Sequence, residues 1–399
     1  MPASQRTSKL KALDIHAGPQ ARAHLQRHGL QPQHIGTIPA AAGGPKGLIL
    51  GPLDRFVFGQ WLTQSSQPVH LVGASIGAWR MATACLNDPA AALQQLEQNY
   101  ISQHFDLRPG EKRLPAARVS AMFAQTLQTF YGGRLAEVLQ HPRYALHVLT
   151  SRGRGPLSRE RGAATVLAYL GAFMSNLVAR RALAAWLERV VFSTGSCGAG
   201  GVGSLPFAAH DYPTRQVALT TDNFFAALQA SCSIPFVLQA VRDIAGAPGG
   251  AYWDGGVTDY HLHLDYAGAQ NAIDSVAACE DAISAGGQNG LNTGSATGAL
   301  VLYPHFQRSV VPGWLDKHLR WRHGATAFLD NMVLLAPNPQ WVKTLPNGKL
   351  PDRVDFTHYG TDLAARMKVW RAATSAAQQL ADEFAAWLER PDMGQVRVL

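Results

Sequence analysis

A serine in a G-x-S-x-G pattern at residues 73–77 is the first group in this sequence with the surroundings of a nucleophile. An apolar run precedes it and a helical segment follows, so Ser75 is expected on a tight turn between a strand and a helix. Such a turn projects the hydroxyl from the sheet, and Gly73 and Gly77 leave room for the neighbouring backbone. The N–H of Ile76, at the helix start, can point toward developing negative charge. The pattern predicts a catalytic nucleophile at Ser75, with an ordinary turn serine as the alternative.

A glycine-rich turn, G-G-P-K-G at residues 43–47, directly follows another apolar run. Small residues let successive backbone N–H groups, such as those of Gly43 and Gly44, converge on an anion. An oxyanion hole and a phosphate cradle both fit this turn, and an ordinary β–α turn is the structural alternative. A P-loop is excluded because the pattern G-x-x-x-x-G-K-[ST] is absent here.

Asp254 is followed by Gly255 and Gly256 and preceded by a Tyr-Trp pair. An aspartate beside glycines at a strand end can approach another loop closely. An aspartate that caps a turn produces the same local pattern. From this motif alone, both interpretations stay open.

Taken together, these motifs resemble the signatures of the patatin-like phospholipase family, which are G-G-G-x-[RK]-G, G-x-S-x-G, A-S-x-x-x-P and D-G-[GA]. The sequence has A-G-G-P-K-G at 42–47, G-A-S-I-G at 73–77, A-S-C-S-I-P at 230–235 and D-G-G at 254–256. One such motif is a weak signal, whereas four in the family order are specific. They frame residues 34–305.

The resemblance implies a Ser75–Asp254 dyad that uses no histidine, no cofactor and no metal. Asp254 would take the Ser75 proton as Oγ attacks a carbonyl, and water would later release the acyl group. Backbone donors of Gly43, Gly44 and Ile76 would form the oxyanion hole. Lys46 stands where arginine is usual in the family and would bind the substrate or its anionic group.

The implied function is that of a serine acyl-ester hydrolase, a lipid acyl hydrolase similar to phospholipase A. An acyl thioesterase and an intracellular polyhydroxyalkanoate hydrolase are alternatives, because their substrates present the same carbonyl to the same serine. A lipid-binding protein with a decayed site is a further alternative, and the intact Ser75 and Asp254 count against it.

The alternation of apolar runs and helical segments predicts an α/β protein. Strands are expected at 34–42, 69–73, 144–150, 190–193, 216–221 and 300–304, and helices at 48–61, 76–86, 223–232 and 361–388. The resemblance implies a three-layer α/β/α patatin-like fold with a mainly parallel central sheet. Its catalytic core would span 34–305 with a helical insertion around 88–190, and 306–399 would form a C-terminal helical extension packed on the core.

Two other patterns indicate different chemistry. Residues 198–203 fit G-x-G-x-x-G, but L-P-F follows at 205–207 where a dinucleotide site needs a helix, so a loop near the site is expected. Four polar residues alternate along a later segment: Asp259, His261, His263 and Asp265. On a strand they would share one side, as a solvent-facing edge by default or as a metal site. A triad with His261 as base is a related alternative.

The charge balance favours an anionic partner. Lys and Arg number 35 against 27 Asp and Glu, giving a net charge of +8, and arginines concentrate in residues 143–189. Nucleic acid is not expected as the partner, because the sequence has no nucleic-acid-binding motif and no basic–aromatic repeat. The expected partners are a lipid or other acyl-ester substrate and an anionic membrane surface. A solvated helical face is the default for these arginines. The alternative is a docking lid, in which the apolar run 166–178 covers an acyl pocket and Arg180 and Arg181 meet the lipid.

Four cysteines are scattered without CxxC spacing: Cys85, Cys197, Cys232 and Cys279. This spacing argues against a zinc ribbon and a disulfide framework and fits a reducing compartment. The first twenty residues have no apolar signal segment, and the most apolar helical candidate, 163–178, is too short and interrupted to span a membrane. A cytoplasmic protein, with peripheral membrane contact at most, is expected.

Overall fold

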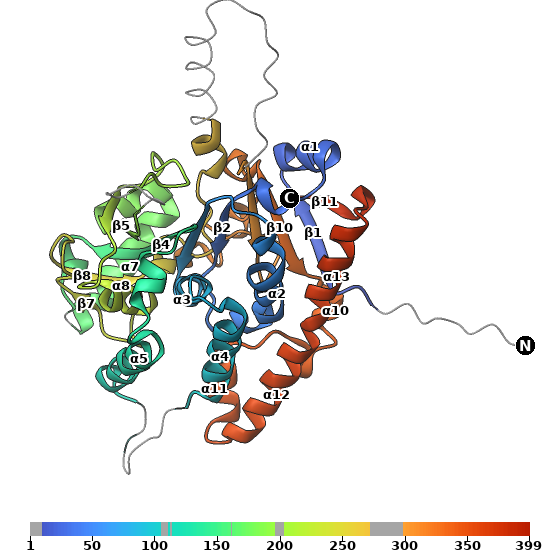
Figure 1. The fold of residues 1–399 in the computed structure, drawn as a ribbon. Coiled ribbons are helices and arrows are strands. Elements are labelled where there is room, and N and C mark those ends of the chain that lie inside the picture. Colours follow the sequence, from blue (N-terminus) through green and yellow to red (C-terminus); the bar gives the residue numbers. More distant parts are fainter. Residues whose placement is uncertain (1–9, 105–110, 112–113, 161, 196–202, 272–297) are drawn as a thin grey trace, which may run out of the picture.

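The structure, a computed structural model, describes residues 10–104, 111, 114–160, 162–195, 203–271 and 298–399. Within these residues the chain folds as an α/β protein on one mixed, mainly parallel sheet of eleven strands (Figure 1). The sheet order is β11-β1-β10-β9-β2-β3-β4-β5-β6, with β8 paired to β4 and β7 to β8. The strands are β1 Leu13–Ala17, β2 Ile35–Ala40, β3 Val69–Ala74, β4 Tyr144–Gly153, β5 Leu187–Ser193, β6 Thr214–Ala218, β7 Val241–Arg242, β8 Ala251–Asp254, β9 Leu300–Pro304, β10 Met332–Pro337 and β11 Val396–Val398.

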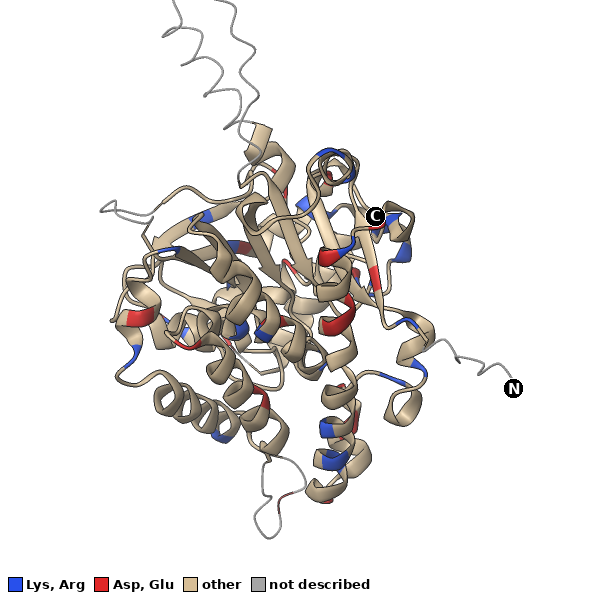
Figure 2. Ribbon diagram, turned by 45° about the vertical axis from the view of Figure 1, so that its right-hand side comes forward, with Lys and Arg blue, Asp and Glu red and all other residues tan. Residues whose placement is uncertain are grey.

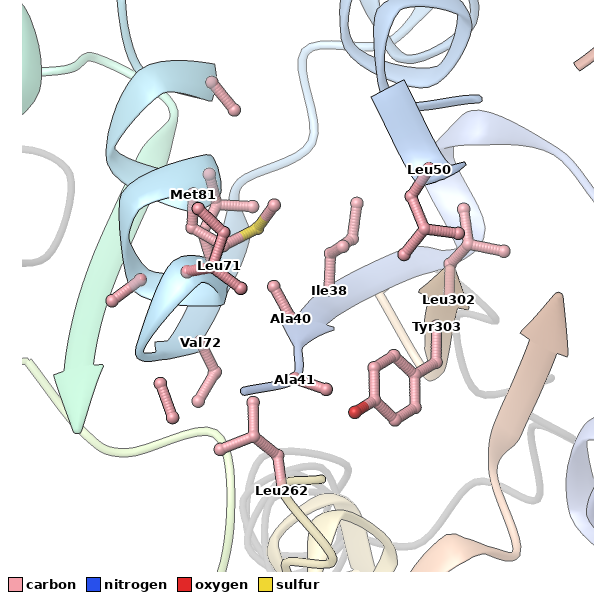
Figure 3. Close-up of a cluster of buried hydrophobic side chains, with 14 of the residues drawn as sticks. Ile38, Ala40, Ala41, Leu50, Leu71, Val72, Met81, Leu262, Leu302 and Tyr303 are labelled. Atoms are coloured by element: carbon pink, nitrogen blue, oxygen red, sulfur yellow. The ribbon is translucent and has the colours of Figure 1, made fainter. Parts of the chain in front are cut away.

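The central strands are short apolar runs that are buried along nearly their whole length. Burial without alternation is typical of a parallel sheet covered on both faces. The core around the central strands includes Ile38 of β2, Leu71 of β3 with Met81 of α3 and, on the side of Leu262, Tyr303 of β9 (Figure 3). The predicted α/β class with a mainly parallel central sheet is therefore confirmed.

Helices surround this sheet, and α3 packs against β2, β3 and β4 while α8 packs against β4 and β8. The α-helices are α1 Pro19–His28, α2 Gly51–Phe56, α3 Ile76–Ala84, α4 Pro89–Ser102, α5 Ala116–Tyr131, α6 Leu135–Leu139, α7 Ala163–Val178, α8 Phe224–Cys232, α10 Pro339–Val342, α11 Val354–Tyr359, α12 Leu363–Ala376 and α13 Gln378–Glu389. Short 3-10 helices matter at the site: η2 Gly44–Leu50, η7 Gly255–Val257, η8 Trp314–Asp316 and η9 Arg320–Arg322. In the described part of the chain, no helix is both long enough and apolar enough to cross a membrane.

The C-terminal segment 306–399 is not wholly helical, which corrects the sequence-based expectation. β10 lies between β1 and β9, and β11 pairs with β1, so both ends of the described chain extend the same sheet (Figure 1). The run M-V-L-L-A-P of β10 is fully buried, as in a central strand. The predicted helical tail is present as α12 and α13, and α12 lies beside α4. The C-terminal segment is thereby joined to the body that carries the motifs.

Candidate active site

Two strands end against each other beside β4. β3 runs parallel to β4, and its last residue, Ala74, pairs with Leu149. β8 runs antiparallel to β4, and its last residue, Asp254, pairs with the next β4 residue, Thr150. Because β5 pairs with the opposite edge of β4, β3 and β8 approach along the same edge from opposite directions. The residue after β3, Ser75, therefore meets the end of β8.

The expected contact between the serine and the aspartate is present. Ser75 Oγ donates a hydrogen bond to Asp254 Oδ2 at 2.6 Å, and the two residues are 3% and 5% exposed. Ser75 has a φ of 57°, a conformation that side chains rarely adopt and that is typical of a strained strand-to-helix turn. The N–H of Ser75 donates to Ser231 Oγ at 3.0 Å, and Ser231 Oγ donates to the Leu149 carbonyl at 2.7 Å. Ser231 thus ties the turn to β4.

Close packing explains the glycines of the turn. A Cβ on Gly77 would collide with the carbonyl oxygen of Ala40 in β2, and a Cβ on Gly73 would collide with the backbone of Ala78 in α3. The absence of side chains lets α3 start directly above β2 and β3. Ile76 is the first residue of α3, so its N–H has no partner within the helix.

The carboxylate of Asp254 is held from several directions. Its Oδ1 accepts the N–H of Gly256 at 2.7 Å, its own N–H donates to the Ser233 carbonyl, and Ser151 Oγ donates to its carbonyl oxygen. Burial raises the pKa of Asp254 to about 6, although hydrogen bonding by Ser75, the charge of Arg353 and the Gly256 N–H act in the opposite direction. A carboxylate with such a pKa is ionised at neutral pH and is a better proton acceptor than an exposed one.

The glycine-rich turn borders the same site. Gly43 precedes η2 and lines, together with Asp254, a cavity of about 170 Å³. Gly44 begins η2 with a φ of +57°, which favours glycine, and a Cβ there would lie 3.2 Å from Arg353 Nε. The N–H groups at this helix start have no partners within the helix, and Pro45 has no N–H to add. The turn can therefore supply backbone donors to an anion beside Ser75.

The cavity joins motif residues to residues that the sequence did not indicate. Its walls are formed by Ala42, Gly43, Lys46, Ile234, Pro235, Asp254, Gly256, Val257, Tyr260, Trp314, Lys317, Asp352, Arg353 and Val354. Lys46 was expected here, and its Nζ lies 5.4 Å from the centre of the Phe306 ring. Trp314, Lys317 and Arg353 come from the C-terminal segment, far along the chain from every motif, so no local pattern could have identified them.

The model of the family described as patatin-like phospholipase matches residues 43–261, which is more than half of the chain. The chain belongs to the patatin-like phospholipase family. No curated protein matches it. The match includes the glycine-rich turn, Ser75 and Asp254, and it ends before Lys317 and Arg353. The C-terminal segment of this chain therefore adds side chains to a cavity whose other lining residues lie between Ala42 and Tyr260.

The four alternating polar residues, from Asp259 to Asp265, do not lie on a strand, which corrects that expectation. Asp259, His261 and His263 are buried rather than solvent-facing. His261 Nδ1 lies 3.1 Å from the Ser309 carbonyl, His263 Nε2 lies 2.9 Å from Thr326 Oγ1, and Asp265 Oδ1 accepts the Gly268 N–H at 2.8 Å. Within the described ranges, no three His, Cys, Asp or Glu side chains are grouped so that they could hold a metal ion. The hydrogen-bond acceptor of Ser75 Oγ is Asp254 and not His261.

Asp259 instead belongs to a buried ion-pair network. Arg189 donates from Nη2 to Asp259 Oδ1 at 2.6 Å and from Nε to Asp259 Oδ2 at 2.8 Å, and it also contacts Asp211 at 3.2 Å. Arg180 contacts Asp316 at 3.2 Å and Asp259 at 3.4 Å. The default expectation placed the arginines of residues 143–189 on a solvated helical face. It is wrong for Arg189, which is buried in this network. Lys and Arg are scattered over the ribbon and interspersed with Asp and Glu in the view of Figure 2.

The docking-lid alternative also made a claim about the apolar run 166–178, which lies in α7. Its side chains Val166, Leu167, Leu170, Met174 and Val178 are exposed, with fractions from 52% to 86%. The opposite side is buried through Ala168, Tyr169 and Ala172. The helix thus packs through one side and leaves an apolar side open. Residues 198–202 of the G-x-G-x-x-G pattern lie outside the described residues, so the loop expected there is not assessed.

Cys232 follows Ser231 at the end of α8 and lies beside the dyad. Burial and the neighbouring charge of Asp254 raise the pKa of its thiol well above the ordinary value, while hydrogen bonding with Ser75 acts in the opposite direction. A thiol that stays protonated is a poor nucleophile. Cys85 and Cys232, the cysteines among the described residues, are both free and buried.

Proposed function

We propose that this member of the patatin-like phospholipase family is a serine hydrolase of acyl esters, with Ser75 as nucleophile and Asp254 as its base. The observation that carries the proposal is the 2.6 Å hydrogen bond from Ser75 Oγ to Asp254 Oδ2 in a buried site. A hydroxyl paired with a carboxylate that remains basic near neutral pH is the minimum unit for nucleophilic acyl transfer.

During acylation one proton moves first from Ser75 to Asp254 and then from Asp254 to the leaving group. As Ser75 Oγ attacks the carbonyl carbon, its proton passes to Asp254 Oδ2 and the carbonyl oxygen becomes an oxyanion. When the tetrahedral intermediate collapses, the bond to the leaving oxygen breaks and Asp254 returns the proton to that oxygen. An alcohol leaves and an acyl-enzyme remains.

Deacylation repeats the sequence with water. Asp254 accepts a proton from the attacking water, a second tetrahedral intermediate forms, and Ser75 Oγ leaves with that proton. The products are the carboxylic acid and the free enzyme, so no redox partner or cofactor is consumed. The N–H groups of Gly43, Gly44 and Ile76 would stabilise both oxyanions, because they come from helix starts next to the serine.

The substrate that we propose is a lipid acyl ester, as for a phospholipase A, and the apolar part of the cavity supports it. Ile234, Pro235, Val257 and Trp314 line the wall that an acyl chain would contact. A thioester or a polyhydroxyalkanoate oligomer offers the same carbonyl, and a non-catalytic lipid-binding protein would need no reactive serine. These alternatives are separated by the experiments below.

We further propose peripheral contact with an anionic lipid bilayer through an α7 surface, defined by the exposed apolar residues of α7 together with Phe236, Val237 and Trp321. This surface continues from the cavity wall, since Phe236 and Val237 follow Ile234 and Pro235, and the rings of Tyr169 and Phe236 are 5.5 Å apart. Arg322 joins η9 to α7 through the Leu177 carbonyl. Exposed cations follow at its edge: Arg181, Lys317 and Arg320. An apolar centre with a basic rim matches an anionic bilayer.

Ester hydrolysis tests the proposal directly. We expect the wild-type protein to hydrolyse p-nitrophenyl butyrate, and Ser75→Ala and Asp254→Asn each to lose about a thousandfold or more in kcat. Because the two groups act as one unit, the double variant loses little more than either single variant. Ser102→Ala, at an exposed position of α4, is the matched control that retains activity.

A fluorophosphonate probe gives a second readout. It reacts with an activated serine by displacement of fluoride, and we expect mass spectrometry to find the adduct on Ser75 and none on the Asp254→Asn protein. Labelling of another residue, or hydrolysis that persists in Ser75→Ala, would contradict the assignment. Neither hydrolysis nor labelling of the folded wild-type protein would favour a non-catalytic lipid-binding protein. Comparison of cellular lipids, thioesters and polyester oligomers after incubation with wild type and Ser75→Ala identifies the acyl donor.

A further inference from the structure

Three cationic side chains from separate segments line the cavity that holds Asp254. Lys46 lies in η2, Lys317 directly follows η8, and Arg353 directly precedes α11. Lys46 is half-buried, and Lys317 and Arg353 are exposed at the cavity mouth; among the described residues, none of these three side chains forms an ion pair or a hydrogen bond with the rest of the protein. Unpaired cations converging on one cavity are the usual composition of an anion site.

The acidic groups of the cavity do not neutralise these cations. Asp254 is hydrogen-bonded to Ser75 and Gly256. Asp352 is paired with Lys349 at 2.7 Å, and its Oδ1 also accepts the N–H of Val354 at 2.9 Å. Lys349 is shared between Asp352 and Asp355, which lies 2.6 Å from it, so it compensates the charge of Asp352 only in part. The three cations outnumber the two carboxylates that line the cavity, Asp254 and Asp352, so the cavity keeps an excess of positive charge.

Arg353 is held in position by its neighbours in the chain. The carboxylate of Asp355 is buried and accepts the N–H of Asp352 at 3.0 Å and the indole N–H of Trp370 at 2.8 Å. These bonds fix the turn that carries Arg353 onto α12. Gly44 leaves room for the Arg353 side chain, because a Cβ on Gly44 would lie 3.2 Å from its Nε. The exposed side chain of Arg353 therefore passes beside the glycine-rich turn, on the side of the cavity that Asp254 lines.

Electrostatic coupling among these groups supports the same arrangement. Burial lowers the pKa of Lys46, and the charges of Lys317 and Arg353 lower it further, while Asp352 acts in the opposite direction. Arg353 also acts on Asp254, whose pKa its charge reduces. Each cation thus repels the others at short range, and an anion placed among them would relieve that repulsion.

We propose that Lys46, Lys317 and Arg353 form an anion subsite that binds a negatively charged phosphate or carboxylate group of the ester hydrolysed at Ser75. The inference rests on the proposed function and narrows its substrates to acyl esters with an anionic group close to the scissile bond. Two of the three residues lie beyond residues 43–261, so the C-terminal segment contributes to selectivity in this chain. Arg353 and Lys317 are specificity-determining residues, since neither exchanges a proton with the substrate.

Hydrolysis of three matched probes tests the subsite. The probes are 1-octanoylglycerol, which is neutral, its 3-phosphate and its 3-hemisuccinate, assayed below their aggregation concentrations. We expect wild-type kcat/KM to be higher for at least one anionic probe than for the neutral one. The anionic preference is the ratio of kcat/KM for the anionic probe to kcat/KM for the neutral probe. We expect Arg353→Gln and Lys317→Gln each to reduce this ratio about 10- to 100-fold, the usual effect of losing a hydrogen bond to a charged group. Arg371→Gln, at an exposed site of α12, is the matched control and leaves the ratio unchanged.

The anionic probes distinguish the two ligand sources. Preference for the 3-phosphate alone identifies a phosphate-bearing lipid, preference for the hemisuccinate alone identifies a carboxylate, and similar preference for both identifies charge itself. Arg353→Lys restores part of the ratio, because it returns the charge without the planar guanidinium. A wild-type enzyme that hydrolyses all three probes equally well, or a ratio insensitive to both substitutions, overturns the inference.

Binding to an inactive protein separates this inference from the proposed function. In Ser75→Ala, calorimetry measures the affinity for 1-octanoylglycerol 3-phosphate, and we expect Ser75→Ala/Arg353→Gln to bind about 10-fold or more weakly. If the wild type hydrolyses no ester and Ser75→Ala still binds this probe through Arg353, the hydrolase proposal fails and the subsite stands. If ester hydrolysis depends on Ser75 and binding does not depend on Arg353 or Lys317, the subsite fails alone. Lys317 and Arg353 are both exposed and come from separate segments, so the Lys317 variant tests the subsite independently of the Arg353 variants.

Discussion

The hydroxyl of Ser75 donates a hydrogen bond to the carboxylate of Asp254, with 2.6 Å between Oγ and Oδ2, and Asp254 is only 5% exposed. The same burial that makes this carboxylate costly to ionise also makes it a stronger base, with a pKa raised to about 6. Basicity and ionisation are thus balanced close to neutral pH. A dyad without histidine needs this balance, because an exposed aspartate with an ordinary pKa would be too weak a base.

The pH dependence of hydrolysis follows from that pKa. Asp254 accepts a proton only when ionised, so kcat/KM for p-nitrophenyl butyrate is expected to fall below about pH 6 and to approach a tenfold decrease per pH unit. The neutral ester itself does not titrate in this range. Arg353→Gln removes a cation that lowers the pKa of Asp254, so its acidic limb moves to higher pH. An acidic limb near pH 4 would show that burial does not control this carboxylate.

The backbone strain at Ser75 predicts different stabilities for two inactive variants. Ser75→Ala and Ser75→Gly both remove the hydroxyl, but only alanine keeps a Cβ at a φ of 57°. We expect the glycine variant to be more stable than the alanine variant by about 1–2 kcal/mol, measured by urea unfolding. Ala121→Gly, at an exposed site within α5, is the control, where glycine costs about 1 kcal/mol instead. Equal stability of the two Ser75 variants would mean that the turn relaxes without strain.

The buried ion pair between Arg189 and Asp259 predicts that Asp259 stabilises the fold, although its spacing in the sequence also fitted a metal ligand. Burial alone would raise the pKa of Asp259, but Arg189 and Arg180 hold it below its ordinary value. Asp259→Asn leaves the fully buried Arg189 with Asp211 as its remaining acidic partner, so we expect a loss of about 3 kcal/mol in unfolding free energy. Asp211→Asn, at a more exposed position, costs less. A chelator that lowers the melting temperature of wild type but not of Asp259→Asn would support a metal site instead.

The sequence could predict the contact between Ser75 and Asp254 because each residue lies in a local pattern. The glycines around Ser75 are required by contacts within a strand, a turn and a helix that are consecutive in the chain. Asp254 was assigned through the family resemblance, and its meeting with Ser75 depends on the pairing of β3 and β8 along one edge of β4. That pairing is a property of the sheet, which no single motif contains.

Other parts of the molecule had no local pattern to reveal them. β10 is an ordinary apolar run without a flanking motif, and its place between β1 and β9 depends on residues far along the chain. The alternation from Asp259 to Asp265 suggested a strand, but the partners of Arg189 and the buried histidines determine a turn there. Arg353 reaches the cavity because Asp355 and Trp370 fix its turn. Tertiary contacts decide such positions, whereas sequence spacing decides only local ones.

The exposed side of α7 leads to the last prediction, which concerns lipid binding. Leu167 and Leu170 are 68% and 54% exposed, so Leu167→Asn/Leu170→Asn removes apolar contact without disturbing a packed side chain. We expect this variant to bind vesicles of phosphatidylglycerol and phosphatidylcholine about tenfold more weakly in a sedimentation assay. Val398→Asn is the matched control, because Val398 is 63% exposed on β11 and lies outside the α7 surface.

The basic rim of the α7 surface adds a salt dependence to this prediction. Arg181 is exposed, and Arg181→Glu is expected to weaken binding about fivefold or more at low salt, with a smaller effect as salt screens the anionic surface. Arg180 is unsuitable for the test, because its ion pairs with Asp316 and Asp259 hold the fold and its substitution would confound binding with stability. Hydrolysis of soluble p-nitrophenyl butyrate reports whether the active site of each variant is intact. Equal binding to neutral and anionic vesicles, insensitive to salt and to both substitutions, would show that the open side of α7 does not meet an anionic bilayer.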